Sequence, residues 1–270
     1  MAEPIVSPAD SSPHPSPREP PSLAPPPPSI ADRLAAVSPA LLLLRLSGRV
    51  EIGSSTLVRV GHRFLLATAG HTIDDAGDHE IRVVPSGRTA AEPLPFLRRS
   101  RPRRGDDDLA WVELAAETVA RHRLGFVELA AVGAGAPGDA GERCFLVQGY
   151  PAERTLAASL DGFDLRARGF VTVAAAARPG DVAVLYPPPA AAEELPAPHP
   201  YGISGGGIWT CPRGPAAVGW EGATRLVGVA RGWRPRRNTL YGTPIELWLR
   251  HVAADFPDLR SGLDRHRPRG

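Results

Sequence analysis

Hydrophobic and polar residues follow one another in short stretches through the middle of the chain. Leucines stand at positions 42, 44 and 46, and further apolar stretches follow at 50–52, 56–60 and 63–69, with turn-forming residues between them. Alternation with a period of two places side chains on the two faces of a strand. Short stretches of this kind, recurring about every 8–12 residues, indicate an all-β sandwich or barrel.

The pattern continues along the rest of the chain and ends in a different element. Further strands are predicted at 80–85, 109–114, 143–148, 163–171, 182–186 and 226–230. Apolar residues at helical spacing follow Pro244, which predicts a closing helix at about 244–254. We therefore expect two similar β-rich halves, at about 40–125 and about 140–243, with the helix after them.

The two ends of the chain differ in composition from this core. Residues 1–30 are dominated by proline and serine, with four prolines at 25–28. Such a segment has little to bury, so we expect a disordered or polyproline tail, which offers a docking segment for a partner. Residues 256–270 are expected to be a polar tail. The folded domain is then expected at 31–255.

Composition excludes several classes of protein. The net charge of +2 gives no reason to expect a nucleic-acid partner. The first residues lack the basic and apolar regions of a signal peptide, and the apolar run at 40–44 is too short to span a bilayer. We therefore expect a cytoplasmic protein with no membrane partner. The two cysteines, Cys144 and Cys211, are expected to be reduced thiols, with a bridge left open as the alternative.

Candidate chemistry first appears at Ser204, within the sequence Tyr-Gly-Ile-Ser-Gly-Gly-Gly-Ile-Trp of positions 201–209. Glycines on both sides of the serine allow the backbone to turn sharply and to approach a ligand closely. A hydroxyl beside converging backbone N–H groups is what acyl transfer requires. Taken alone, the stretch is more typical of a Gly/Ser-rich turn between strands.

Two upstream motifs strengthen the catalytic interpretation. Thr68-Ala69-Gly70-His71 places a histidine just after a buried strand, and Asp108 stands directly before the strand expected at 109–114. With Ser204, the order is His, Asp, Ser. Over about residues 40–255 the chain resembles the trypsin/chymotrypsin-like serine peptidases, in particular their compact bacterial members. The resemblance implies an all-β fold of two six-stranded antiparallel β-barrels with a C-terminal helix, and an active site in the cleft between the barrels.

The resemblance also implies a role for each residue. Ser204 would be the nucleophile, His71 the general base and acid, and Asp108 the group that orients the imidazole. The backbone N–H groups of Gly202 and Ser204 would form the oxyanion hole. A protein or peptide would be the substrate and no cofactor would be needed. The residues expected beside the substrate pocket are Val229, Ala230 and Arg231.

Some features depart from the family or leave alternatives open. Asp107 competes with Asp108 for the carboxylate role. Many trypsin-like enzymes carry an aspartate immediately before the serine, which pairs with a newly released N-terminus. Here that residue is the apolar Ile203, so activation by such an ion pair is not expected. A catalytically inactive peptide-binding or scaffolding module on the same fold remains the alternative function.

Other interpretations fit the sequence less well. Positions 202–206 also satisfy the Gly-x-Ser-x-Gly elbow of α/β-hydrolases, which needs a strand before it and a helix after it. Here a Pro-rich loop precedes and no helix begins. Arginines at 231, 234, 236 and 237 either favour acidic substrate side chains or form a solvated loop, and the basic run at 98–104 is expected to be an exposed loop. Histidines and cysteines show no metal-ligand spacing.

Overall fold

The computed structural model describes residues 28–44, 50–74, 76–77, 80–88, 93–103, 105, 107–133, 144–152, 165–176, 181–186, 199–211 and 224–264. Most of the expected Pro-rich tail lies outside the described residues. Helix α1 (Pro28–Ala36) already includes the last three residues of that predicted tail. Ile30 and Leu34 are buried on one side of this helix, which explains why it folds onto the domain.

The first half of the chain contains strands β1 to β8. Their bounds are β1 (Ala40–Leu44), β2 (Val50–Ser54), β3 (Thr56–Val60), β4 (Arg63–Ala69), β5 (Ile81–Val84), β6 (Arg98–Arg99), β7 (Leu109–Leu114) and β8 (Val127–Glu128). The helical turns among them are α2 (Gly70–Ile73), α3 (Ala116–Arg121) and η2 (Leu129–Ala131). The strands form a three-stranded sheet, β2-β1-β5, and a five-stranded sheet, β6-β7-β4-β3-β8.

The second half forms one six-stranded antiparallel sheet. Its strands are β9 (Cys144–Gly149), β10 (Arg168–Val173), β11 (Val182–Leu185), β12 (Gly207–Cys211), β13 (Arg225–Arg234) and β14 (Thr239–Pro244). The order is β10-β9-β12-β13-β14-β11. A bridge between Ala174 and Val184 joins the two edges, and Thr172 Oγ1 donates to Leu185 O at 2.7 Å. The sheet therefore closes into a barrel.

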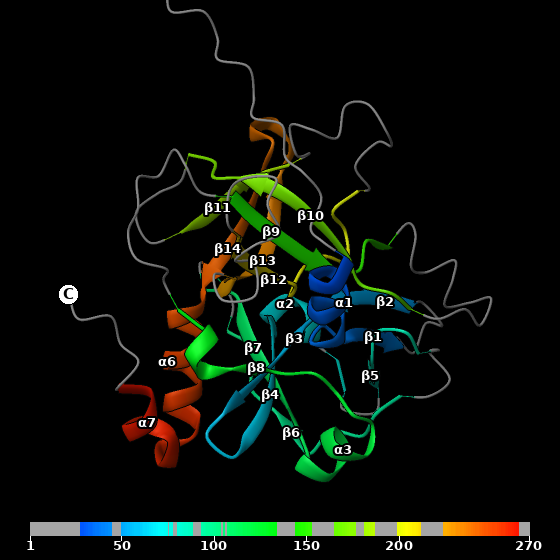
Figure 1. Ribbon diagram of the computed structural model, residues 1–270, viewed down its shortest axis with the longest axis vertical. Coiled ribbons are helices and arrows are strands. Elements are labelled where there is room, and N and C mark those ends of the chain that lie inside the picture. Colours follow the sequence, from blue (N-terminus) through cyan, green and yellow to red (C-terminus); the bar gives the residue numbers. More distant parts are fainter. Residues whose placement is uncertain are drawn as a thin grey trace, which may run out of the picture.

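The two halves stack on each other, and the C-terminal helix lies along the first one (Figure 1). Helix α6 (Ile245–Asp255) confirms the closing helix predicted from the sequence. Fully buried side chains of this helix, including Trp248 and Val252, belong to a core that also contains Leu65 of β4 and Leu146 of β9. One apolar core thus holds both halves and the helix together.

The residues after α6 differ from the expected polar tail. They form η5 (Pro257–Leu259) and α7 (Arg260–Asp264). Phe256, Leu259 and Leu263 are 2%, 6% and 7% exposed and join the same core. Their spacing of three and four residues places them on one side of a helical path, so they pack despite the many charged residues between them.

The two cysteines lie directly opposite each other on β9 and β12. Both remain thiols and both are buried. Burial raises the pKa of the Cys211 thiol far above its usual range, and the neighbouring Cys144 raises it further. No helix among the described residues is both long enough and apolar enough to cross a bilayer.

Candidate active site

His71 and Asp108 are in direct contact. Asp108 Oδ2 lies 2.6 Å from His71 Nδ1, and the backbone N–H of His71 donates to Asp108 Oδ1 at 2.9 Å. The imidazole is half exposed, whereas the carboxylate is only 14% exposed. Both carboxylate oxygens therefore hold one histidine, which leaves its Nε2 available to a neighbour.

The pairing of β4 with β7 produces this contact. Ala69 at the end of β4 lies opposite Leu109 at the start of β7, and Gly70 N donates to Asp108 O at 3.0 Å. Gly70 must be glycine, because a Cβ there would meet the backbone oxygen of Arg103 at 2.5 Å. The side chains that follow β4 and precede β7 consequently face each other.

Of the two adjacent aspartates, Asp108 is the one that contacts His71, as the resemblance implied. Asp108 adopts a left-handed backbone conformation with φ of 39°, which aspartate tolerates better than most residues. The preceding residue is held through its backbone, because Thr243 Oγ1 donates to Asp107 O at 2.6 Å. The turn is thereby fixed from the second half of the chain.

Close packing shapes the loop around Ser204. Gly202 and Gly205 have φ of 90° and 92°, values that favour glycine. A Cβ at Gly205 would overlap the carbonyl oxygen of Ser54, and one at Gly206 would overlap that of Gln148. These glycines are therefore required by space as well as by conformation.

Backbone hydrogen bonds from three N–H groups hold the Ser204 loop. The N–H groups of Ile203, Gly205 and Gly206 donate to Pro200 O, Ala230 O and Ile203 O at 3.1, 2.7 and 2.8 Å. Among the described residues, the N–H groups of Gly202 and Ser204 donate no hydrogen bond. These two amides are the pair that the sequence analysis assigned to an oxyanion hole.

The carbonyl of Tyr201 has a partner outside the loop. Ala152 N donates to Tyr201 O at 2.7 Å. Within one peptide unit the C=O and N–H groups point in opposite directions. Fixing Tyr201 O therefore also fixes the direction of the Gly202 N–H.

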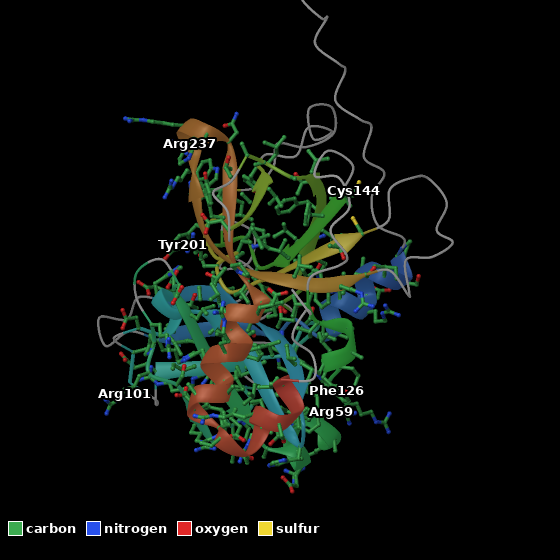
Figure 2. The ribbon with its side chains drawn as sticks, turned by 90° about the vertical axis from the view of Figure 1, so that its left-hand side faces the viewer. Arg59, Arg101, Phe126, Cys144, Tyr201 and Arg237 are labelled. Carbon is green, nitrogen blue, oxygen red and sulfur yellow. The ribbon has the colours of Figure 1, made fainter. Side chains whose placement is uncertain are left out.

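Ser54 connects the Ser204 loop to β4, the strand that precedes His71. Ser54 N donates to Ser204 O at 2.8 Å, and Thr68 Oγ1 of β4 donates to Ser54 O at 2.8 Å. Within the described part of the chain Ser204 Oγ makes no hydrogen bond, to His71 or to any other residue. Figure 2 shows the neighbouring Tyr201 at the level where the two halves meet.

The predicted pocket residues lie on β13 beside this loop. Val229 faces the core between the halves, and Ala230 exchanges backbone hydrogen bonds with Gly205 and Gly206. Arg231 Nη2 lies 2.9 Å from Asp181 Oδ1, so its charge already has a partner. A role for Arg231 in selecting acidic substrates stays a prediction.

Several neighbours of the site were not found by sequence reasoning. His199 packs edge to face on Trp233, with 5.1 Å between ring centroids, and Tyr201 is 46% exposed next to Gly202. His199 stands at the end of a Pro-rich stretch that carries no motif, so nothing in the sequence marked it. The adjacency of Tyr201 to the glycine motif was the one available signal.

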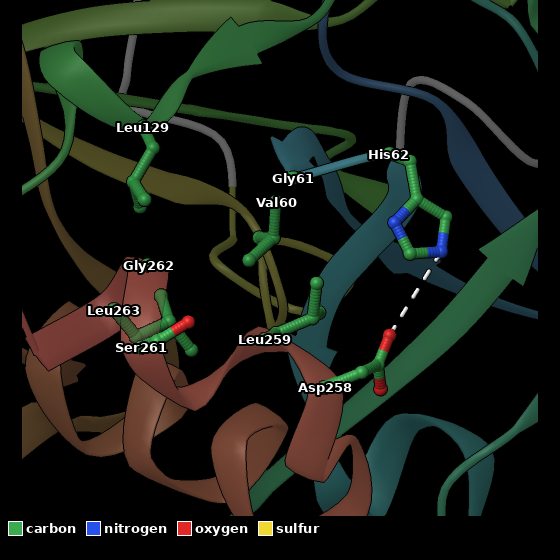
Figure 3. A pocket seen from close by; sticks show the side chains of 9 residues that line it. All are labelled: Val60, Gly61, His62, Leu129, Asp258, Leu259, Ser261, Gly262 and Leu263. Atoms are coloured by element: carbon green, nitrogen blue, oxygen red, sulfur yellow. Dashed lines mark ion pairs between the residues drawn. The ribbon is translucent and has the colours of Figure 1, made fainter.

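A second His–Asp pair does not form a comparable site. His62, Asp258 and Ser261 line a pocket of about 220 Å³ between β3, η5 and α7. His62 Nε2 lies 3.9 Å from Asp258 Oδ2, beyond hydrogen-bond distance, and Arg63 Nη2 lies 3.3 Å from the same oxygen. Figure 3 shows Ser261 well away from His62. Likewise, no three potential metal ligands gather among the described residues.

No protein-family model matches the chain, and no curated protein matches its sequence. Solved structures do match. A serine endoprotease from Yersinia pestis has a TM-score of 0.51 and 14% identity, over 83% of this chain and 64% of its own. HL collagenase has a TM-score of 0.52 and 11% identity, over 83% of this chain and 94% of its own. An inactivated protease paralogue of the scabies mite has a TM-score of 0.51 and 14% identity, over 84% of this chain and 96% of its own.

These matches establish the architecture of the chain. It has the two-barrel fold of the trypsin-like serine proteases, which confirms the fold that the sequence motifs implied. The chain spans less than two thirds of the length of the Yersinia protein. Because one of the three is described as inactivated, the fold leaves catalysis to be argued from the site itself.

Proposed function

We propose that the protein is a serine endopeptidase in which Ser204, His71 and Asp108 form a catalytic triad. The observation that carries this proposal is the contact between Asp108 and His71, with 2.6 Å between Oδ2 and Nδ1. A histidine so held keeps one tautomer and one orientation, which a general base needs and a surface histidine does not. The glycine-bounded Ser204 loop is linked through Ser54 to β4, the strand that precedes His71, which supports the same proposal.

The chemistry follows from this arrangement. His71 Nε2 takes the proton of Ser204 Oγ as that oxygen attacks the carbonyl carbon of a peptide bond. The same nitrogen then returns the proton to the leaving amine, and an acyl-enzyme remains on Ser204. A water molecule then gives a proton to His71 Nε2 as its oxygen attacks the acyl carbon. His71 passes this proton to Ser204 Oγ as the bond between that oxygen and the acyl carbon breaks and the second product leaves. No cofactor takes part.

Two further groups lower the barrier. The Asp108 carboxylate stabilises the positive charge that develops on His71 during each proton transfer. The N–H groups of Gly202 and Ser204 donate to the oxyanion of the tetrahedral intermediate. Its negative charge develops on the way to the transition state and is absent from the substrate carbonyl. Both amides are directed by neighbouring hydrogen bonds before substrate arrives, so little reorganisation is needed.

A protein or peptide substrate, a cytoplasmic location and docking through the Pro-rich tail belong to the same proposal. They rest on the fold and on the composition of the chain. Most of the tail lies outside the described residues, so its part in docking is proposed from its composition alone.

Labelling with a fluorophosphonate probe tests the proposal. Wild type should be labelled, Ser204→Ala should not, and His71→Ala and Asp108→Asn should react far more slowly. Circular dichroism of each variant shows whether the fold is retained. A folded wild type that resists the probe would instead favour the non-catalytic peptide-binding function on this fold.

A further inference from the structure

Ser54, the last residue of β2, makes hydrogen bonds with every group it can offer. Its Oγ donates to Gly202 O at 2.7 Å and accepts from Tyr150 N at 2.9 Å. Its backbone N–H donates to Ser204 O, and its carbonyl accepts from Thr68 Oγ1. The residue is fully buried at 0% exposure. A serine of the first half thus binds two segments of the second.

The bond to Gly202 completes a set. The carbonyls of residues 201, 202, 203 and 204 accept in turn from Ala152 N, Ser54 Oγ, Gly206 N and Ser54 N. Each bond fixes one peptide plane of the loop, and with it the direction of the adjoining N–H. Three of the four donors are backbone groups. The Ser54 hydroxyl is the side-chain donor in the set.

We propose that Ser54 is a positioning residue that holds the loop so that the Gly202 and Ser204 amides converge on one point. This inference rests on the catalytic function proposed above. The peptide between Gly202 and Ile203 links the two amides. Without the hydroxyl, Gly202 O loses its donor, and this buried peptide is then held at its other end, by the Ile203 N–H bond to Pro200 O at 3.1 Å, so the adjoining amides can shift.

The next residue supplies a matched control. Ser55 is also 0% exposed, and its Oγ also donates to a backbone carbonyl, that of Pro39, at 2.8 Å. That bond joins two segments of the first half and does not reach the Ser204 loop. Ser55→Ala therefore removes the same chemical group at equal burial without touching the loop.

Fluorophosphonate inactivation kinetics and hydrogen–deuterium exchange test the proposal on wild type, Ser54→Ala and Ser55→Ala. The maximal inactivation rate of Ser54→Ala should fall by about 10- to 100-fold, because misplaced donors weaken the transition state. Its half-saturating probe concentration should stay within about 2-fold, since ground-state binding is unaffected. Exchange at the amides of Ile203, Gly205 and Gly206 should quicken in Ser54→Ala and not in Ser55→Ala.

The outcomes separate this proposal from the catalytic one. An active wild type with Ser54→Ala equal to Ser55→Ala in both measurements overturns the positioning role and leaves the peptidase standing. An unlabelled wild type in which Ser54→Ala alone quickens loop exchange supports the positioning role and removes the catalytic one. Should Ser54→Ala fail to fold, Ser54→Cys keeps the shape with a weak donor, and the same slowing and loosening are expected from it.

Discussion

Asp108 and Asp107 are adjacent carboxylates with different tasks. Asp108 binds His71 through both oxygens, whereas the contact of its neighbour to Thr243 uses the backbone carbonyl. Asp108→Asn keeps a side chain that tolerates a positive φ and presents an amide where a second acceptor is needed. The change therefore tests electrostatics and tautomer rather than folding.

We predict that Asp108→Asn lowers the fluorophosphonate labelling rate by about 10⁴-fold, a magnitude that comes from trypsin-type triads rather than from this chain. Asp107→Asn should stay within about 3-fold of wild type, because its side chain is not needed for the contact with His71. Labelling rates of both variants against wild type provide the measurement. Equal losses in the two variants would contradict the assignment.

His71, Asp108 and Ser204 each stand in a local motif, so the sequence could single them out. The structure shows the contact between His71 and Asp108, and the triad with Ser204 stays a prediction. The sequence was silent on Ser54 and Ala152. The Ser54 hydroxyl binds a carbonyl 148 positions away, and Ala152 acts through its backbone N–H. Contacts of this kind depend on how distant segments meet, and no local pattern encodes them.

Helix α6 attaches to β7 next to the turn that carries Asp108. Trp248 Nε1 donates to Ala110 O at 3.0 Å, two residues after that carboxylate. Trp111 Nε1 of β7 donates in the other direction, to Asp255 Oδ2 at 2.8 Å. The helix and the strand are thus joined by two indole hydrogen bonds, one buried and one at the edge of the core.

We predict that Trp248→Phe lowers the free energy of unfolding by about 1–3 kcal/mol more than Trp209→Phe does. Both indoles are almost fully buried, but Trp209 Nε1 has no partner among the described residues. Only the first substitution removes a hydrogen bond to a buried carbonyl. Urea unfolding of the two variants measures the difference, and equal losses would show that the hydrogen bond to Ala110 contributes nothing.

A buried histidine on α6 makes stability depend on pH. Burial lowers the pKa of His251, with Arg103 acting in the same direction and Asp255 and Asp107 in the opposite one. Between the lowered pKa and the ordinary value of about 6.5, the unfolded chain binds more protons than the folded one. The stability contribution of neutral His251 is therefore lost as pH falls below about 6.5.

We expect the free energy of unfolding to fall more steeply with acid in wild type than in His251→Gln, by at most about 1.4 kcal/mol per pH unit. Urea unfolding at pH 7.5 and pH 5.5 measures both slopes. The other titrating groups are common to the two proteins, so they cancel in the comparison. Parallel slopes would mean that His251 does not titrate in this range.

For the helices and strands, the presence of an element was more predictable than the residues at which it begins and ends. Alternating residues indicated ten of the fourteen strands that the structure describes, and Pro244 with helical spacing predicted α6. The strands β6, β8, β12 and β14 were not predicted, and the basic run expected to be an exposed loop contains β6. The segment after α6 was misread because its charged residues outnumber Phe256, Leu259 and Leu263, although these three decide its packing. Average polarity hides a narrow apolar face.

The whole molecule places the parts of the site on both halves. His71 and Asp108 come from the first half, Ser204 from the second, and Ser54 bonds one to the other. The solved structures share this architecture at 11–14% identity, so few identical residues are needed to keep the fold. The division of the first half into two sheets was not predictable from the strand pattern.

Ile203, the residue before Ser204, leads to a prediction about whether activity depends on the N-terminus. Its side chain is 1% exposed and packs with Val147 and Ile208 inside the second barrel. An ammonium group has no carboxylate to pair with at this position, so activity should not depend on a particular N-terminus. Acetylating the α-amino group, or extending it with a tag, should leave the labelling rate within about 2-fold. A tenfold loss on either change would refute this.

The opposed cysteines have a practical consequence for covalent chemistry on this protein. The chain has two cysteines in all, both are buried, and burial keeps Cys211 protonated at any ordinary pH. Alkylation of sulfur requires the thiolate. Warheads that attack hydroxyl, imidazole and sulfur alike, such as peptidyl chloromethyl ketones, should therefore react with the native protein at its serine and histidine and leave both sulfur atoms unmodified.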